Sequence, residues 1–291
     1  MKIAVCVRSV IDPEGRYRLR DDKSVDFRGA PSMMDPGDAV ALEAGVALAA
    51  EHGADLTVYT AAGDGANEVL RVALAQGASS AVQVVGELPR GSLEAGENLA
   101  EVVAEQGLPD IVLCGVASSD GGSGGTGAVL AARLDLPIIQ NTLAFDGIAD
   151  GLAEVQRRRD GGYRELVRVQ LPAVFTIESI AAVPRFPTTR ERLHAQRASI
   201  TTVEADAAQD LSTGELEVLG YRIPPPRLLG IPWPGSELSA RERLRFLVQG
   251  GQTRQASAGG PLTGDAESVA GAIADYLQTN GFVPPSTESG D

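Results

Sequence analysis

Short apolar runs that alternate with longer helical patterns are the feature that most limits how this chain can fold. The runs cover residues 2–7, 55–60, 81–85 and 110–115. Amphipathic or Ala-rich stretches fill the intervals, at about 38–52, 65–77 and 92–106. This alternation predicts strand–helix–strand units and a parallel sheet. Because Val, Ile and Leu follow one another without interruption in the runs, we expect both faces of these strands to be covered.

The pattern changes after residue 150. Residues 152–159 and 163–170 flank Asp160-Gly161-Gly162, which predicts a hairpin. A further apolar run, 173–178, follows Pro172. We expect these strands to extend or cross the edge of the sheet.

Pro and Gly become frequent beyond about residue 200, where helical patterns occur only at about 239–249 and 266–279. This composition predicts an extended arm, and short helices on an arm need another surface to pack against. We therefore predict two regions. Residues 1–203 form a doubly wound, mostly parallel α/β domain. Residues 204–291 form a Pro/Gly-rich arm with short helices that docks on a partner chain.

Composition narrows the function. A formal net charge of −14 argues against nucleic-acid binding, which needs a basic surface, and no stretch approaches the roughly 18 apolar residues of a membrane span. Residues 1–7 look like a strand rather than a signal peptide, and we expect no direct membrane insertion. Cys6 and Cys114 each lie in an apolar run, which favours reduced packing residues in a cytoplasmic protein. Two Cys and two His are too few for a disulfide framework or a zinc site.

A Gly-rich loop after the fourth apolar run is the most informative motif. It starts at Gly115, includes Asp120-Gly121-Gly122-Ser123-Gly124-Gly125-Thr126, and leads into a helical pattern that ends at Leu134. A loop that opens a helix presents unpaired N–H groups and the positive end of the helix dipole, and glycines let the backbone approach a phosphate. Thr126 can add a hydroxyl donor. We interpret the loop as a phosphate site; a mobile surface loop is the alternative.

Known catalytic patterns do not match. No Lys follows the glycines, which excludes a Walker-type loop, and the dinucleotide fingerprint belongs after the first strand, where this chain has residues 8–13 instead. His52 ends a helical pattern and His194 lies among arginines, which favours surface roles for both. Asp12 and Asp35 follow strand ends and are either ligand contacts or turn residues. We therefore expect a binding or carrier protein without side-chain catalysis.

Four blocks across residues 1–203 resemble the beta subunit of electron transfer flavoproteins. Residues 7–12, Val-Arg-Ser-Val-Ile-Asp, are similar to the family's Val-Lys-Arg-Val-Ile-Asp. Residues 34–38, Met-Asp-Pro-Gly-Asp, are similar to its Met-Asn-Pro-Phe block. Residues 115–137 align without gaps with the family's nucleotide loop, and residues 160–188 align with its following segment. The order and spacing of the blocks together carry the resemblance.

The resemblance implies a Rossmann-like fold related to the adenine nucleotide alpha hydrolases. It implies an alpha-subunit partner in a heterodimer and AMP in this subunit, with a second FAD in place of AMP in bifurcating relatives. It also implies a redox FAD at or near the subunit interface, which shuttles electrons from a dehydrogenase to a downstream acceptor. Carried over position by position, the nucleotide contacts are Cys6, Asp35, Pro36, Gly37, Asp38, Ala61 and Gly115 through Thr126, which include Asp120, Gly121, Gly122, Ser123, Gly124 and Gly125.

The resemblance also implies partner contacts. Arg185 takes an interface or flavin-side position, and Arg227 lies in a segment similar to the family's arm, which wraps onto the alpha subunit. Where the family exposes a Leu that docks on acyl-CoA dehydrogenases, this chain has Thr189, followed by Arg190. An apolar anchor supplies much of an interface's energy, whereas Thr supplies little. We therefore predict a dedicated flavin- or redox-cofactor-dependent dehydrogenase other than the usual fatty-acid enzymes; the mycofactocin-associated branch is one alternative.

Two departures from the family pattern change contacts or charge. Gly124 and Gly125 replace the family's Asn and Gln, which leaves backbone donors but removes two side-chain contacts. Arg158 replaces an acidic residue, which reverses the sign of a surface that would attract a basic partner. We interpret the arginines at 157–159 as a solvated face rather than a binding patch.

A stand-alone adenine-nucleotide-binding protein of the universal-stress type is the alternative function. Such a protein shares the sheet and the Gly-rich loop but needs neither residues 161–200 nor the arm. A nucleotide hydrolase is a third alternative, and it lacks a visible catalytic base. A yellow, flavin-containing heterodimer would favour the first function, and a colourless ATP-binding homodimer would favour the second.

Overall fold

The structure is a computed structural model that describes residues 1–12, 14–15, 18–26, 31–61, 63, 65–85, 92–205, 220, 238–248 and 264–279. The chain divides into two compact units, residues 1–222 and residues 223–291. The predicted Arg227 lies outside the described residues.

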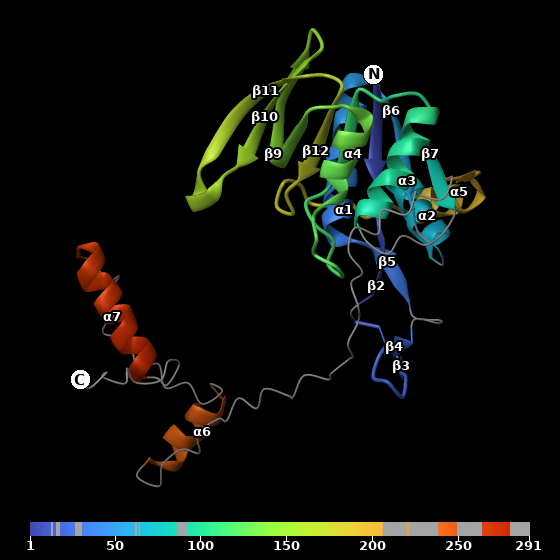
Figure 1. Cartoon of the computed structure of the whole chain (residues 1–291). Helices are drawn as coiled ribbons and strands as arrows, with labels where there is room; N and C mark the ends of the chain where they lie inside the picture. Colours follow the sequence, from blue (N-terminus) through green and yellow to red (C-terminus); the bar gives the residue numbers. More distant parts are fainter. Residues whose placement is uncertain are drawn as a thin grey trace. The chain divides into compact units, whose positions relative to one another are not determined.

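A nine-stranded sheet forms the centre of the first unit, in the order β11-β10-β9-β12-β8-β1-β6-β7-β13 (Figure 1). Neighbouring strands from β9 to β13 run parallel, and β10 is antiparallel to both β9 and β11. The strands are β1 (Lys2–Cys6), β6 (Asp55–Thr60), β7 (Ser80–Val85), β8 (Ile111–Gly115), β9 (Ile138–Ala149), β10 (Leu152–Arg158), β11 (Arg164–Gln170), β12 (Ala173–Ile177) and β13 (Thr201–Glu204).

Helices cover both faces of this sheet. Two apolar clusters form the core, and side chains that alternate along β1 belong to different clusters. The cluster with Ile3 and Val5 includes residues of α1 (Pro36–His52) and α2 (Ala66–Gln76). The cluster with Ala4 and Cys6 includes residues of α3 (Ser92–Glu105) and α4 (Thr126–Leu134). The fold is therefore the predicted doubly wound α/β fold.

Smaller elements complete the described chain. Two ribbons, β2 (Ser9–Ile11) with β5 (Ser32–Met34) and β3 (Arg18–Leu19) with β4 (Val25–Asp26), lie between β1 and α1 in the sequence. A 3₁₀ turn at Asp160–Gly162 joins β10 to β11, and α5 (Thr189–Arg197) packs on α2. The second unit contains α6 (Ala240–Val248) and α7 (Ala266–Thr279). No helix among the described residues has the length and hydropathy to cross a membrane.

The main sequence predictions for these elements are confirmed. The four apolar runs are β1, β6, β7 and β8, the predicted hairpin is β10–β11 at the end of the sheet, and the two helical patterns of the arm are α6 and α7. The run 173–178 forms the predicted strand, β12, but its expected place at the edge is wrong, because β12 pairs with β8 on one side and β9 on the other. The sequence analysis did not predict β9, β13, the two ribbons or α5. For α5 a signal was present, because Thr188 and Glu191 form a capping box: the Glu191 carboxylate accepts the Thr188 N–H at 2.6 Å.

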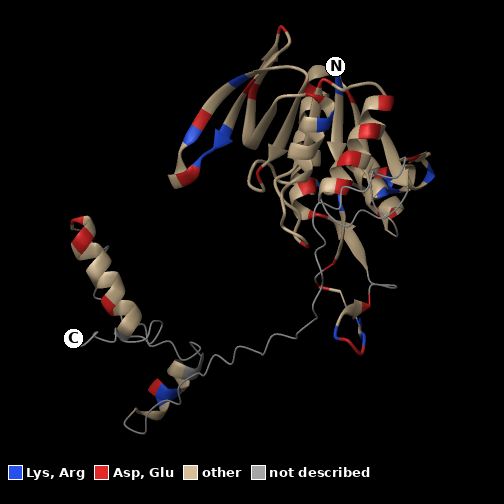
Figure 2. Ribbon diagram, in the orientation of Figure 1, with Lys and Arg blue, Asp and Glu red and all other residues tan. Residues whose placement is uncertain are grey.

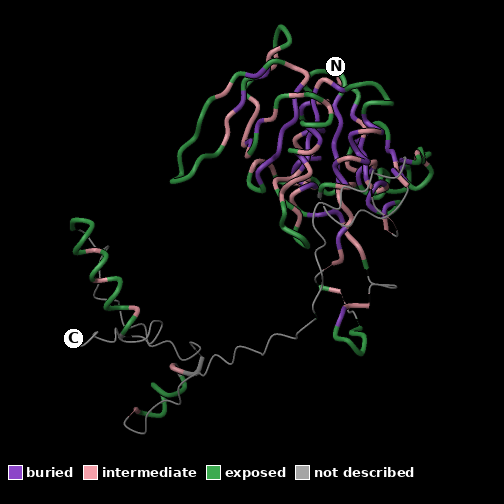
Figure 3. The backbone as a smooth tube through the Cα atoms, viewed as in Figure 1, coloured by how far each residue is buried: buried purple, intermediate pink, exposed green. Residues whose placement is uncertain are grey.

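Burial differs along the sheet. Ile111, Val112 and Leu113 of β8 are completely buried, whereas most residues of β11 are exposed. Figure 3 shows this change from the buried central strands to the exposed hairpin. The unbroken apolar runs thus correspond to strands that helices cover on both sides.

Candidate functional site

The chain reverses its direction across the sheet at β1. From β1 the next two main strands, β6 and β7, are added on one side, whereas β8 and then β12 are added on the other. The chain connections that leave the carboxyl ends of β1 and β8 therefore lead in opposite directions, which makes this place a topological switch point. Open α/β sheets bind their ligands at such a point.

A cleft opens at these strand ends. Its walls come from the end of β1, the start of α1, the residue after β6, one face of α3, and the loop that joins β8 to α4: Cys6, Val7, Arg8, Asp38, Ala61, Ala95, Leu99, Cys114, Gly115, Val116, Ala117, Ser118, Gly124 and Thr126. Nine predicted nucleotide contacts thus lie together: Cys6, Asp38, Ala61, Gly115, Val116, Ala117, Ser118, Gly124 and Thr126.

Other predicted residues lie beside the cleft without lining it. Asp35, Pro36 and Gly37 form the start of α1, and Asp120, Gly121, Gly122, Ser123 and Gly125 lie farther along the loop. The sequence analysis missed five lining residues, Val7, Arg8, Ala95, Leu99 and Cys114. Ala95 and Leu99 lie one helical turn apart on α3, and only the packing of α3 against the sheet reveals them.

Asp38 joins the two strand ends that form the cleft. Its Oδ2 accepts the backbone N–H of Arg8 at 2.7 Å, and its Oδ1 accepts the N–H of Gly115 at 2.8 Å. Burial, with a smaller contribution from the nearby Asp35 charge, raises the pKa of Asp38 to about 7, although the N–H bonds of Gly115 and Arg8 act in the opposite direction. One carboxyl group therefore fixes the spacing between the ends of β1 and β8.

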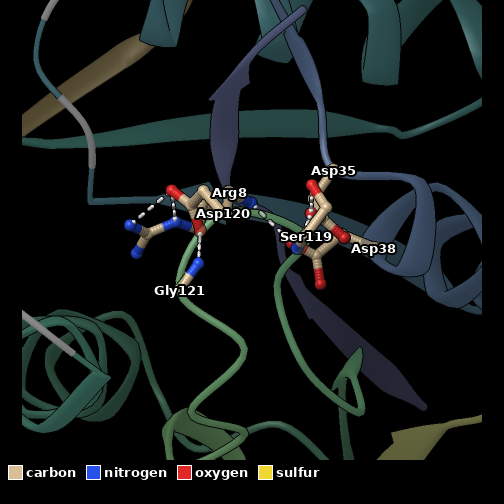
Figure 4. A network of polar contacts seen from close by, with 6 residues as sticks. All are labelled: Arg8, Asp35, Asp38, Ser119, Asp120 and Gly121. Carbon is tan, nitrogen blue, oxygen red and sulfur yellow. Dashed lines mark hydrogen bonds and ion pairs between the residues drawn. The ribbon is translucent and has the colours of Figure 1, made fainter. Parts of the chain in front are cut away.

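Asp35 connects α1 to the Gly-rich loop. Its Oδ1 caps the helix by accepting the Gly37 N–H at 2.9 Å. Its Oδ2 accepts both the backbone N–H of Ser119 at 2.6 Å and the Ser119 hydroxyl at 2.7 Å. Figure 4 shows the contacts of Asp35 with Ser119 beside the bond from Arg8 to Asp38. The start of α1 thus holds both the beginning of the Gly-rich loop, through Asp35, and the ends of β1 and β8, through Asp38.

The N-terminus of α4 is free of a side-chain cap. The N-cap residue is Gly125, which makes no side-chain hydrogen bond to the first turn. Gly122 and Gly124 have positive φ of 64° and 63°, and a Cβ at Gly124 would lie 2.9 Å from the Val116 carbonyl oxygen. A side chain at Gly127 would meet Thr176 Cγ2 at 2.6 Å, so α4 packs closely on β12. The backbone N–H groups at the start of α4, together with the helix dipole, fit an anionic group such as a phosphate.

An ion pair lies beside the mouth of the cleft. The Arg8 Nε and Nη2 atoms donate to Asp120 Oδ2 at 3.0 and 2.8 Å, and Asp120 Oδ1 accepts the Gly121 N–H at 2.6 Å (Figure 4). Hydrogen bonds from Arg8 and Ser118 lower the pKa of Asp120, although partial burial acts in the opposite direction. Arg8 and Asp120 come from the two sides of the switch point.

The two cysteines are free and buried. Burial raises the pKa of Cys6 to about 12 and that of Cys114 well above its ordinary value, and the Asp38 charge adds to both shifts. These thiols stay protonated at neutral pH, which does not suit a nucleophile. Within the described part of the chain, no group of three metal-ligating side chains occurs.

The predicted partner contacts lie in and before α5. Arg185 makes a two-pronged ion pair with Glu43 of α1, in which Nε and Nη2 each donate at 2.8 Å, while Thr189 and Arg190 are exposed at the start of α5. Three large apolar side chains in this segment were missed: Ile180, Val183 and Phe186 are 69 %, 87 % and 93 % exposed. Phe186 directly follows the fixed Arg185.

The fold and the cleft define a doubly wound α/β protein with a cleft at its switch point. A family described as "Electron transfer flavoprotein domain" matches residues 24–208. The electron transfer flavoprotein subunit beta of Syntrophomonas wolfei is 31 % identical over 232 residues, which cover 79 % of this chain and 89 % of the relative. The bovine (Bos taurus) subunit beta is 32 % identical over 241 residues, covering 79 % and 92 %.

A third relative, "Protein FixA" of Azorhizobium caulinodans, is 29 % identical over 269 residues, covering 89 % of this chain and 92 % of the relative. The chain therefore belongs to the electron transfer flavoprotein family, among its beta subunits.

Proposed function

We propose that the switch-point cleft binds AMP and that the chain works as a heterodimer with an alpha subunit. The observation that carries this proposal is the uncapped N-terminus of α4 behind the glycines at 121, 122, 124 and 125, at the divergence of β1 and β8. Backbone N–H groups and the positive end of a helix dipole suit a phosphate. A second FAD in place of AMP remains the alternative ligand.

In this proposal the chain itself performs no bond chemistry. The FAD, when bound at or near the subunit interface, carries the electrons. The described residues hold a nucleotide: Asp35 and Asp38 fix the loop and the strand ends, and Thr126 offers a hydroxyl. The protonated thiols of Cys6 and Cys114 add apolar surface to the cleft. Free thiols also favour a cytoplasmic location.

The alpha subunit is proposed to bind the arm, residues 204–291. Leu244 on α6 and Ile273 on α7 are 64 % and 48 % exposed. Short helices of this kind are marginal on their own in water, and a partner surface would bury these apolar side chains.

A dehydrogenase is proposed to dock on residues 180–190. The bidentate pair of Arg185 with Glu43 holds this segment on α1, so the neighbouring Phe186 ring is presented to solvent. An exposed aromatic side chain on a fixed backbone suits an interface anchor. Phe186 can thus supply the apolar contact that Thr189 does not.

Co-expression with an alpha subunit, followed by extraction of bound small molecules, tests the proposal. We expect a yellow heterodimer that releases one FAD and one AMP, identified by absorbance and mass spectrometry. Release of two FAD and no AMP would show that the ligand of the cleft is a second FAD and not AMP. A colourless homodimer that binds ATP, or a pair without any nucleotide, would refute the proposal.

A second experiment tests the docking segment. Electron transfer to the heterodimer is measured with a panel of dehydrogenases, for wild type and for Phe186→Ala. We expect the productive dehydrogenase to lose activity mainly through a higher KM, because the anchor is lost. Rapid reduction by a standard acyl-CoA dehydrogenase would contradict the prediction of a dedicated partner.

A further inference from the structure

The charged side chains that line the cleft decide how an anionic ligand can be neutralised there. The chain carries a formal net charge of −14, and the buried Asp38 lines the cleft. Among the described residues that line the cleft, Arg8 is the only one with a positive charge. A phosphate in this cleft would therefore depend on Arg8 for charge neutralisation by a side chain.

The loop contributes few side-chain donors of its own. Four of its residues between Asp120 and Thr126 are glycines, and the other is Ser123. Its contribution to a phosphate is thus made of backbone N–H groups and hydroxyls. A guanidinium hydrogen bond to a charged oxygen is roughly twice as strong as a neutral one.

Arg8 is held at both ends. Its backbone N–H is bound by Asp38 at 2.7 Å, and its Nε and Nη2 both donate to one oxygen of Asp120. This arrangement uses one edge of the guanidinium, and no described residue accepts a hydrogen bond from its Nη1 atom. The Arg8 side chain is 38 % exposed and lines the cleft, so protein atoms do not enclose it.

We propose that Arg8 is the phosphate-binding side chain of the cleft and that Asp120 positions it. The inference rests on the proposed function, because it assigns the charge recognition of the same nucleotide. Arg8 recognises the phosphate and not the base or the sugar. It therefore sets the preference of the cleft for a nucleotide over a nucleoside, and Asp120 acts only through Arg8.

Calorimetric titration of the nucleotide-stripped heterodimer with AMP and with adenosine tests this assignment. We expect Arg8→Gln to raise the Kd for AMP by about tenfold or more, the loss that a charged hydrogen bond predicts, and to leave the Kd for adenosine unchanged. Arg8→Lys keeps the charge but not the guanidinium fork, and we expect an intermediate Kd for AMP. Added salt should weaken AMP binding more in wild type than in Arg8→Gln.

Arg133→Gln is the matched control. Arg133 on α4 pairs with Glu97 on α3 and does not line the cleft, so the same loss of one charge should leave both affinities unchanged. Equal AMP affinity in Arg8→Gln and wild type would overturn the assignment, and so would a parallel loss of AMP and adenosine binding in both Arg8 variants. A wild-type heterodimer that binds neither compound would instead refute the proposed function.

Discussion

The parallel strands and the hairpin belong to one sheet, but different forces stabilise them. Strands β1, β8 and β12 are buried between helices on both faces. Strands β10 and β11 carry ion pairs near the surface, among them Arg157 with Glu165 and Arg168 with Glu154. Figure 2 shows residues of both charges on this hairpin. Burial of apolar surface contributes far more than exposed ion pairs do.

The difference also separates two tasks. The rigid parallel part ends in the cleft, where Asp38 joins β1 to β8. The hairpin presents Tyr163 and Leu166, which are 75 % and 74 % exposed. We infer that changes in the parallel part alter folding and ligand geometry, whereas changes in the hairpin alter the surface.

Truncation of one large side chain in each region gives the sharpest test. Phe175 of β12 is completely buried, and its ring packs on Phe145 with centroids 4.9 Å apart. We expect Phe175→Ala to lower the free energy of unfolding by about 3–5 kcal/mol, because it leaves a cavity. Leu166→Ala on β11 should change it by less than about 0.5 kcal/mol. Urea denaturation measures both values, and similar losses would contradict the comparison.

A methyl group added to a glycine at the cleft, and to another in the part of β9 that pairs with the hairpin, tests how tightly the backbone is packed. At Gly115 an added Cβ would lie 2.7 Å from Asp38 Oδ1, whereas at Gly147 of β9 it would meet nothing within 4 Å. We expect Gly115→Ala to cost about 1–3 kcal/mol of stability and to weaken AMP binding. Gly147→Ala is the matched control and should stay within about 0.5 kcal/mol of wild type. Normal AMP affinity in Gly115→Ala would show that the cleft tolerates displacement of Asp38.

The pH dependence of stability tests the carboxyl group under the cleft. Burial raises the pKa of Asp38 from 3.8 to about 7, so between these values the folded chain holds a proton that the unfolded chain has lost. Its stabilising contribution is complete below about pH 4 and is lost as pH rises through about 7. We expect the unfolding free energy of wild type, relative to Asp38→Asn, to fall from pH 4 to pH 7. A relative stability that stays constant or rises would show that Asp38 ionises normally in the fold.

Removal of a charge from the hairpin should have the smallest effect. Glu165 pairs with both Arg157, at 2.6 Å, and Arg159, at 3.7 Å, and its side chain is 45 % exposed. We expect Glu165→Gln to change the free energy of unfolding by less than about 1 kcal/mol, because solvent screens these pairs. A loss as large as that of Phe175→Ala, measured by the same denaturation, would mean that the ion pairs hold the hairpin.

The sequence predicted the elements whose signal is local. The unbroken run in β8 and the glycines at the end of β10 each indicate their structure without distant partners. Strand β9 was missed because an irregularity at Asn141, which has a positive φ of 61°, interrupts the alternation of its inward and outward side chains. Strand β13 was missed because only its pairing with β7 makes it a strand.

The candidate site was predictable in part for the same reason. The Gly-rich loop is a local motif, so Gly115, Gly124 and Thr126 could be selected from the sequence. The bond between Asp35 and Ser119 spans 84 positions, and that between Arg8 and Asp120 spans 112. Such contacts depend on how β1 and β8 are brought together, and no spacing along the chain reveals them.

A Cβ at Gly127 would lie 2.6 Å from Thr176 Cγ2 and 3.0 Å from Cys114 Sγ. The underside of α4 has no spare room, so the height of this helix above the sheet is set by a missing side chain and not by the ligand. Larger residues at position 127 would tilt the helix outward and retract its electropositive end. We therefore expect the affinity for the proposed nucleotide to depend also on Gly127, a residue that does not line the cleft.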